Sequence, residues 1–277
     1  MTLPNFVGIG APRAGTTWLN TLLHSHPDVY TPSLRDEINF FDRYYERGTG
    51  WYETLFPSPD DRRAYRAIGE ISPQYLECEA CPERIVTTLP ESRLIVMLRH
   101  PVDRAYSQYG FFVQRRNYRG GFEDFLAATP RALERGFYSR YLKRYLRFFD
   151  RHRILALIFE AAISHHAETK QQLADFLEIA VDRFPAAAGS GKVNPSSVPK
   201  MQFLYGFVAK TGRQLRRWHL EPLVDFVMRT SLPGVLARGK ALPPLDRDLK
   251  RKLSQAYRDE CQELEECLQM DLSRWRD

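Results

Sequence analysis

The sequence has no apolar segment long enough to cross a bilayer. Its amino-terminal residues also lack the basic, apolar and small-residue regions of a signal peptide. The apolar segment 6–10 is far too short for a membrane span and is typical of a buried strand. We therefore expect a cytoplasmic protein without a membrane span.

Cysteine is scarce, with four residues in the whole chain. Cys78 and Cys81 have the C-x-x-C spacing of half a zinc site, whereas Cys261 and Cys267 are differently spaced and have no histidine nearby. A metal site remains an alternative, but the pattern favours reduced thiols without a functional role. We expect no bound metal.

Neither charge is in large excess, because 40 Lys and Arg residues face 34 Asp and Glu residues, for a net charge of +6. Charged residues make up 27% of the chain and hydrophobic residues 43%, which is typical of a globular protein rather than a disordered one. A mildly basic surface suits an anionic ligand without requiring one.

Three apolar segments, 6–10, 94–98 and 154–158, are predicted as buried strands. Helical patterns lie between them, and Pro101 marks the start of a long helix. Strands that alternate with helices require crossover connections. We therefore predict an α/β, P-loop-like three-layer fold, with a central parallel sheet flanked by helices.

The last third of the chain has a different pattern. Residues 185–199 are rich in glycine, serine and proline and are predicted as a loop, and from about residue 200 the chain is predicted to be mostly helical. An apolar stripe predicts one final amphipathic helix through Leu249, Leu253, Tyr257, Leu264 and Leu268. Without an evident linker, we predict a single domain over residues 1–277.

Residues 10–17, with the sequence Gly-Ala-Pro-Arg-Ala-Gly-Thr-Thr, join the first strand to the first helix. The two glycines have the spacing of a P-loop, whose backbone N–H groups bind phosphate at the helix N-terminus. The usual lysine is missing, because Thr16 stands in its place, and the loop carries its cation earlier, at Arg13.

A nucleoside triphosphatase also needs a carboxylate that holds Mg²⁺ at the end of a strand. Here the strand 94–98 is followed by Arg99, which attracts a second anion instead. This arrangement favours a ligand that carries two separated phosphate groups and is bound without a metal. The alternatives are a P-loop kinase or nucleoside triphosphatase, and a non-catalytic protein that binds an anionic polymer through the arginine-rich segment 213–217.

These two segments carry a family resemblance. Residues 10–19 resemble the 5′-phosphosulfate loop, P-K-x-G-T-T-x-L, of sulfotransferases that use 3′-phosphoadenosine 5′-phosphosulfate (PAPS), and residues 94–109 resemble their second signature, strand–R-x-P-x-D-R-x-x-S. The resemblance implies that Arg99 and Ser107 hold the 3′-phosphate. It implies that the 5′-phosphosulfate is bound by Arg13, Ala14, Gly15, Thr16, Thr17 and Trp18.

Three further segments resemble the heparan-type carbohydrate branch of that family. Residues 36–42 are similar to its K-E-x-H-F-F-D block, residues 48–57 to G-x-x-W-Y-x-x-x-F-P, and residues 69–75 to G-E-K-S/T-P-x-Y. Cations of the branch pattern are replaced here by Asp36, Asn39 and Ile71.

The resemblance implies a sulfotransferase that takes PAPS, releases 3′,5′-adenosine bisphosphate and sulfates a hydroxyl or amine of a carbohydrate or another small molecule, without nucleic acid. Arg13 then contacts the sulfuryl group, and Glu37 is the candidate base that takes the acceptor proton. Glu70 is the second candidate, as a base or as a residue that orients the acceptor. The other candidate bases are His24, His26 and His100. Lys192 and Lys200 either close over the nucleotide or are solvated lysines.

Overall fold

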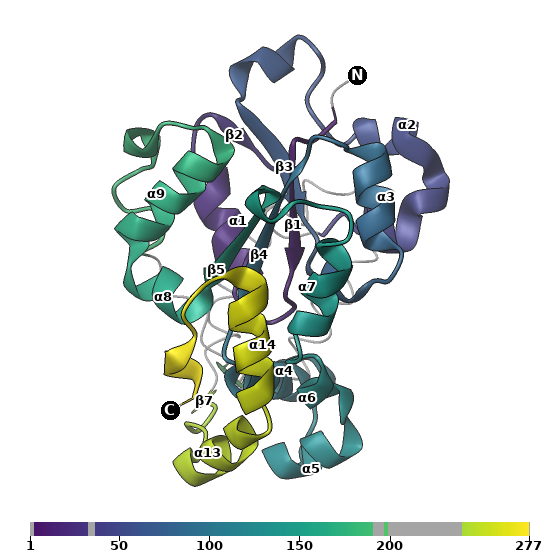
Figure 1. Cartoon of the computed structure of the whole chain (residues 1–277). Coiled ribbons are helices and arrows are strands. Elements are labelled where there is room, and N and C mark those ends of the chain that lie inside the picture. Colours follow the sequence, from purple (N-terminus) through teal and green to yellow (C-terminus); the bar gives the residue numbers. More distant parts are fainter. Residues whose placement is uncertain (1–2, 33–36, 191–196, 199–239, 277) are drawn as a thin grey trace. The chain divides into compact units, whose positions relative to one another are not determined.

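The structure is a computed structural model that describes residues 3–32, 37–190, 197–198 and 240–276 (Figure 1). The chain divides into two compact units. The first comprises residues 1–104, 135–193 and 252–277, and the second comprises residues 105–134 and 194–251. The interpretation of the chain as a single domain stays a prediction.

The first unit is built on a five-stranded sheet with the order β2-β3-β1-β4-β5, in which every neighbouring pair is parallel. Its strands are β1 (Phe6–Gly10), β2 (Val29–Tyr30), β3 (Ala67–Ile71), β4 (Arg93–Leu98) and β5 (Ile154–Ile158). Every residue of β1 and β3 is buried, as expected of central parallel strands covered on both faces. The predicted α/β fold and its three predicted strands are confirmed.

Helices lie on both sides of this sheet. Figure 1 shows α1 (Thr16–His24), α8 (Phe159–Ser164) and α9 (His166–Leu177) on one side, and α2 (Gly48–Glu53), α3 (Cys81–Thr88) and α7 (Ser139–Tyr145) on the other. The carboxyl-terminal helix α14 (Arg258–Leu268) packs against α7, where the buried Glu260 accepts hydrogen bonds from the backbone N–H (2.8 Å) and the hydroxyl (2.7 Å) of Ser139.

Short helical segments connect these elements. A π-helical turn, η1 (Phe40–Tyr44), and a 3₁₀ turn, η2 (Tyr45–Arg47), precede α2, and η4 (Pro73–Glu77) follows β3. Phe40 and Phe41 are both fully buried, and the Phe40 ring stacks on Tyr52 with 4.2 Å between centroids. Core packing is therefore the role of both phenylalanines. The remaining short turns are η3 (Asp61–Ala64), η5 (Arg151–Arg153), η6 (Val181–Arg183) and η7 (Ser273–Trp275).

The long helix α4 (Pro101–Arg116) begins in the first unit, at the predicted proline, and continues into the second. The second unit also holds α5 (Phe122–Ala128), α6 (Arg131–Glu134) and the antiparallel pair β6 (Ser197–Val198) and β7 (Lys240–Ala241). Strand β6 falls inside the segment predicted as a loop, so that prediction is wrong at its end. Of the helices that the structure describes, none combines the length and the apolar content that crossing a bilayer requires.

The predicted final helix is two helices, α13 (Arg247–Gln255) and α14, with a break at Tyr257. The Tyr257 backbone leaves the helical region (φ −108°, ψ 11°) and precedes the first residue of α14, while its side chain is 98% buried. The apolar stripe continues across the break, but Leu249 and Leu253 are half-buried, whereas Tyr257, Leu264 and Leu268 are buried. The stripe alone therefore did not reveal the interruption.

Candidate active site

The loop between β1 and α1 is held against the neighbouring strand, because the Ala11 backbone N–H donates to the Met97 carbonyl at 2.7 Å. Gly15 precedes the helix with φ 96°, a conformation that residues with a Cβ rarely adopt. The first hydrogen bond within α1 runs from Leu19 N–H to the Gly15 carbonyl at 3.1 Å. The helix therefore does not use the N–H groups of residues 16–18, which are available for an anion.

A second cationic position lies at the end of β4. The Arg99 carbonyl accepts a hydrogen bond from the Tyr138 hydroxyl at 2.8 Å, and the guanidinium carbon lies 4.8 Å from the centroid of the Phe159 ring. The Arg99 Nε is buried and has no hydrogen-bond partner among the residues that the structure describes. A buried donor of this kind is unfavourable unless a ligand satisfies it.

Phe159 joins these two positions. A Cβ added to Gly15 would lie 2.3 Å from Cδ2 of the Phe159 ring, the same ring that lies under Arg99. The loop before α1 and Arg99 are thus brought together across one aromatic side chain. Sequence reasoning missed Phe159; the available signal was an aromatic residue directly after the strand 154–158.

The other predicted donor-site residues differ in their surroundings. Ala14 and Thr16 are buried and Thr17 is exposed. Trp18 is buried in α1, and its indole N–H donates to the Gly189 carbonyl at 3.0 Å while the ring stacks on His166 at 5.9 Å. Arg13 is half-buried and has φ 71°.

Three predicted contacts are not tested by the described part of each unit. Ser107 lies on α4 in the second unit, so its convergence with Arg99 stays a prediction. Lys192 and Lys200 lie outside the described residues, as does Asp36.

Glu37 lies in the segment that precedes η1, and its side chain is exposed. Partial desolvation nevertheless raises the pKa of its carboxyl group, against the opposing hydrogen bond from the Asn39 side chain and the charge of Arg43. The Asn39 amide also donates to the Glu37 carbonyl at 3.1 Å. An accessible carboxylate with a raised pKa is a better proton acceptor than an ordinary glutamate, which suits a general base.

Glu70 is in the opposite environment. It lies in β3 with 2% of its surface exposed, and its carboxylate accepts hydrogen bonds from Tyr52 and Tyr75, at 2.8 Å each, and from Ser72 at 2.6 Å. Burial raises the pKa of Glu70 to about 7, and the three hydroxyl donors oppose this rise.

The candidate histidines form contacts within the first unit. His24 Nδ1 lies 3.0 Å from the Thr31 hydroxyl, and the buried His26 lies 2.9 Å from the Ala180 carbonyl. His100 is also buried, with Nε2 3.2 Å from the Trp275 carbonyl. These contacts support a structural role for all three.

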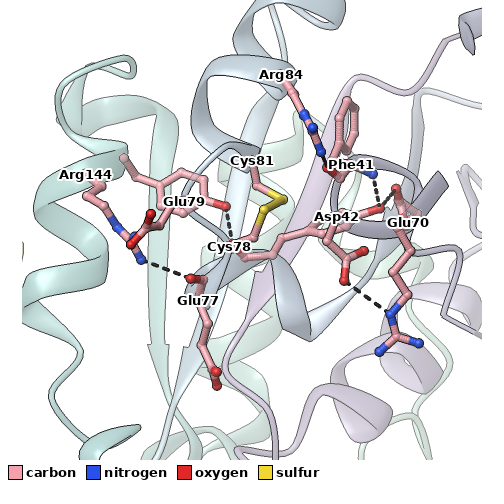
Figure 2. Close-up of a disulfide and its surroundings, with 12 residues drawn as sticks. Phe41, Asp42, Glu70, Glu77, Cys78, Glu79, Cys81, Arg84 and Arg144 are labelled. Atoms are coloured by element: carbon pink, nitrogen blue, oxygen red, sulfur yellow. Dashed lines mark hydrogen bonds and ion pairs between the residues drawn. A yellow bond between two sulfur atoms is a disulfide. The ribbon is translucent and has the colours of Figure 1, made fainter. Parts of the chain in front are cut away.

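Cys78 and Cys81 form a disulfide with a Cα–Cα distance of 5.3 Å (Figure 2). The prediction of reduced thiols is therefore wrong for this pair. The chain is extended at Cys78 and enters α3 at Cys81, and this turn brings the two sulfurs together. Cys261 and Cys267 are free, and among the described residues no three acidic, histidine or cysteine side chains are grouped to hold a metal ion.

Comparisons with known proteins point to one family. The family model for the sulfotransferase domain matches residues 4–195. Human heparan sulfate glucosamine 3-O-sulfotransferase 6 is 33% identical over 185 residues, which is 63% of this chain and 52% of that protein. Human bifunctional heparan sulfate N-deacetylase/N-sulfotransferase 3 is 26% identical over 96% of this chain and 30% of that protein.

A membrane-associated sulfotransferase, kil1 of Dictyostelium discoideum, is 39% identical over 114 residues, or 41% of this chain and 24% of that protein. The chain thus spans about half or less of the length of these curated relatives. Among solved structures, a sulfotransferase from Alicyclobacillus acidocaldarius superposes with a TM-score of 0.72 at 23% identity, with full coverage of both chains. This likeness shows that the two chains share a fold.

Proposed function

Because the chain belongs to the sulfotransferase family, we propose that it transfers a sulfuryl group from PAPS to a hydroxyl or amine of an acceptor. One observation carries the proposal: Gly15 of the anion-binding loop and Arg99 lie against the same Phe159 ring. A ligand with two separated phosphate groups fits two anion sites that are joined in this way. The same family membership argues against the kinase and polymer-binding alternatives.

On the donor side, each end of the nucleotide has its own set of residues. The N–H groups of residues 16–18, with Arg13, bind the 5′-phosphosulfate at the N-terminus of α1. Arg99, together with Ser107, binds the 3′-phosphate, which satisfies the buried Nε of Arg99. Lys192 and Lys200 lie outside the described residues, and their contact with the nucleotide stays a prediction.

On the acceptor side, the chemistry requires one proton transfer. PAPS supplies a sulfuryl group on a phosphate leaving group, and the acceptor oxygen or nitrogen forms a bond to sulfur as the bond to that phosphate breaks. Glu37 takes the acceptor proton, and Arg13 stabilises the charge that develops on the leaving phosphate. The products are the sulfated acceptor and 3′,5′-adenosine bisphosphate.

The acceptor we propose is a carbohydrate, supported by the names of the heparan sulfate relatives. Asp36, Asn39 and Ile71 stand where the resembling pattern has cations. We therefore expect an acceptor that carries fewer sulfate and carboxylate groups than heparan sulfate does. Transfer rates to neutral and to highly sulfated oligosaccharides of equal length test this expectation.

Titration calorimetry with 3′,5′-adenosine bisphosphate, followed by transfer of label from PAPS to a panel of acceptors, tests the function. We expect binding by the unmodified chain, loss of transfer in Arg13→Ala, and normal nucleotide binding without turnover in Glu37→Gln. A chain that takes up no nucleotide and transfers no label would refute the proposal.

A location in the cytoplasm is also proposed, on the ground of the sequence alone. Cell fractionation with an antibody against the chain tests it, and recovery with the membrane fraction would contradict it.

A further inference from the structure

The buried Glu70 carboxylate is the acceptor for three hydroxyl groups that come from different parts of the chain. Tyr52 lies on α2, Ser72 directly follows β3, and Tyr75 lies on η4. Each hydroxyl has one hydrogen to donate, and each donates it to Glu70. The carboxylate therefore fixes the direction in which all three hydroxyls point.

Two of these hydroxyls accept hydrogen bonds from the backbone around η1. The Asn39 N–H donates to Ser72 Oγ at 3.0 Å, and the Phe41 N–H donates to the Tyr75 hydroxyl at 3.3 Å. Both hydroxyls can accept these bonds, because each points its hydrogen at Glu70 and has lone pairs free to face the backbone N–H. On its other side, the Phe41 carbonyl accepts a hydrogen bond from Arg84 at 2.7 Å (Figure 2).

Asn39 connects this network to Glu37. Its backbone is held by Ser72 in a left-handed conformation with φ 54°, which an asparagine adopts more readily than most residues. From that position its side-chain amide donates to the Glu37 carbonyl at 3.1 Å, and the Asn39 side chain lowers the pKa of the Glu37 carboxyl group. A continuous chain of hydrogen bonds thus runs from Glu70 through Ser72 and Asn39 to Glu37.

We propose that Glu70 is a positioning residue, whose ionised carboxylate orients Ser72 and Tyr75 so that they hold Asn39 and Phe41 and thereby fix the Glu37 side chain for proton transfer. The part of this inference that concerns catalysis rests on the proposed function. The part that concerns the hydrogen-bond network does not. Glu70 is poorly placed to serve as the base itself, because its carboxylate is buried and already accepts three hydrogen bonds.

The charge on Glu70 matters because a protonated carboxyl group must itself donate a hydrogen. One of the three hydroxyls would then receive that hydrogen and turn its own hydrogen elsewhere. If Ser72 or Tyr75 receives it, that hydroxyl no longer donates to Glu70 and must reorient beside the backbone N–H that it accepts. Ionised Glu70 therefore accepts from all three hydroxyls, whereas protonated Glu70 loses one of these donors.

Protonation of Glu70 takes place in an accessible pH range. Its pKa is raised by burial to about 7, and the groups that act on it are the hydroxyls of Ser72, Tyr75 and Tyr52, which lower it, and the Asp42 carboxylate, which raises it. Below neutral pH the carboxyl gains its proton, and the links to Asn39 and Phe41 weaken.

Hydrogen exchange at the Asn39 and Phe41 amides tests the network without any need for catalysis. We expect exchange, corrected for intrinsic rates, to be about tenfold or more faster in Glu70→Gln than in the unmodified chain, because the links to a charged acceptor are lost. In the unmodified chain, protection of the same amides should fall as the pH drops through about 7. Tyr52→Phe is the matched control, because Tyr52 contacts Glu70 but does not bind either amide.

The catalytic part is tested in the same variants. In Glu70→Gln, kcat should fall about tenfold or more, while nucleotide affinity measured by calorimetry stays unchanged. Ser72→Ala, which removes the Asn39 link and one donor to Glu70 but keeps the Tyr75 link to Phe41, should reproduce the loss if Glu70→Gln does not fold.

Unchanged amide protection in Glu70→Gln overturns the positioning role. Faster exchange with an unchanged kcat overturns the connection to Glu37. If the unmodified chain transfers no sulfuryl group at all, the proposed function fails, and the exchange measurements still decide whether Glu70 holds this segment.

Discussion

Replacing Glu70 by glutamine should change how the stability of the protein depends on pH. Burial raises the pKa of this carboxyl from its ordinary value of 4.5 to about 7, so the folded protein holds the proton more tightly than the unfolded chain does. The stabilisation that the bound proton supplies is fully present below about pH 4.5 and is lost as the pH rises through about 7. A difference of this size in pKa corresponds to about 3 kcal/mol of unfolding free energy.

Glutamine has nearly the same shape and does not ionise, so the variant should lack this contribution to the pH dependence. We would measure denaturant unfolding of both proteins between about pH 4 and about pH 8. The unfolding free energy of the unmodified chain, relative to Glu70→Gln, should decrease by about 3 kcal/mol over that range. Tyr52→Phe removes one donor that lowers the pKa, so its decrease should extend to higher pH.

A free-energy difference that stays constant with pH would refute this reasoning, because it would mean that Glu70 has the same pKa in the folded and the unfolded chain. The expected result has a functional counterpart. The charged form of Glu70 that orients the network is the form that burial disfavours. The contribution of Glu70 to stability is therefore largest at low pH, where the network that depends on its charge is weakened.

Three further predictions concern the donor site and the disulfide. Gly15→Ala should lower the unfolding free energy by about 2 kcal/mol or more and weaken nucleotide binding, because φ is 96° and the new Cβ overlaps the Phe159 ring. Gly50→Ala, where a Cβ meets nothing within 4 Å, is the control in the same unfolding and binding assays. Arg99→Ala should weaken binding of 3′,5′-adenosine bisphosphate about tenfold to a hundredfold in calorimetry and leave adenosine 5′-monophosphate, which has no 3′-phosphate, unaffected. Reduction of Cys78–Cys81 should lower the unfolding free energy by about 2 kcal/mol, the value expected for so short a loop, and an unchanged denaturation midpoint with and without reductant would contradict this.

The strands that could be predicted from the sequence are those whose burial depends on apolar side chains. β1 and β4 are continuous apolar segments, because central parallel strands are covered on both faces. β5 lies at the edge of the sheet and is only partly buried, but it is also continuously apolar. The phosphate loop was predictable for a similar reason, since its glycine spacing reflects a local backbone requirement.

The strand β3 was not predicted, although it lies in the centre of the same sheet. It contains a glycine and the charged Glu70, and its burial depends on a hydroxyl from Tyr52, which is distant in the sequence. The Cys78–Cys81 bond was missed because C-x-x-C spacing is compatible with a metal, with free thiols and with a disulfide, and only the turn into α3 decides among them. Partners that are distant along the chain leave no local pattern.

The contact between Trp18 and Gly189 makes tryptophan fluorescence a probe of the proposed donor site. Trp18 directly follows the two threonines of the loop, and its indole N–H donates a hydrogen bond to the carbonyl of Gly189, three residues before Lys192. Any rearrangement of that connection when a nucleotide enters changes the polarity around the ring, and with it the wavelength of tryptophan emission. Ligand titrations can therefore be followed by intrinsic fluorescence on the unlabelled protein, with Trp18→Phe to identify the source of the signal.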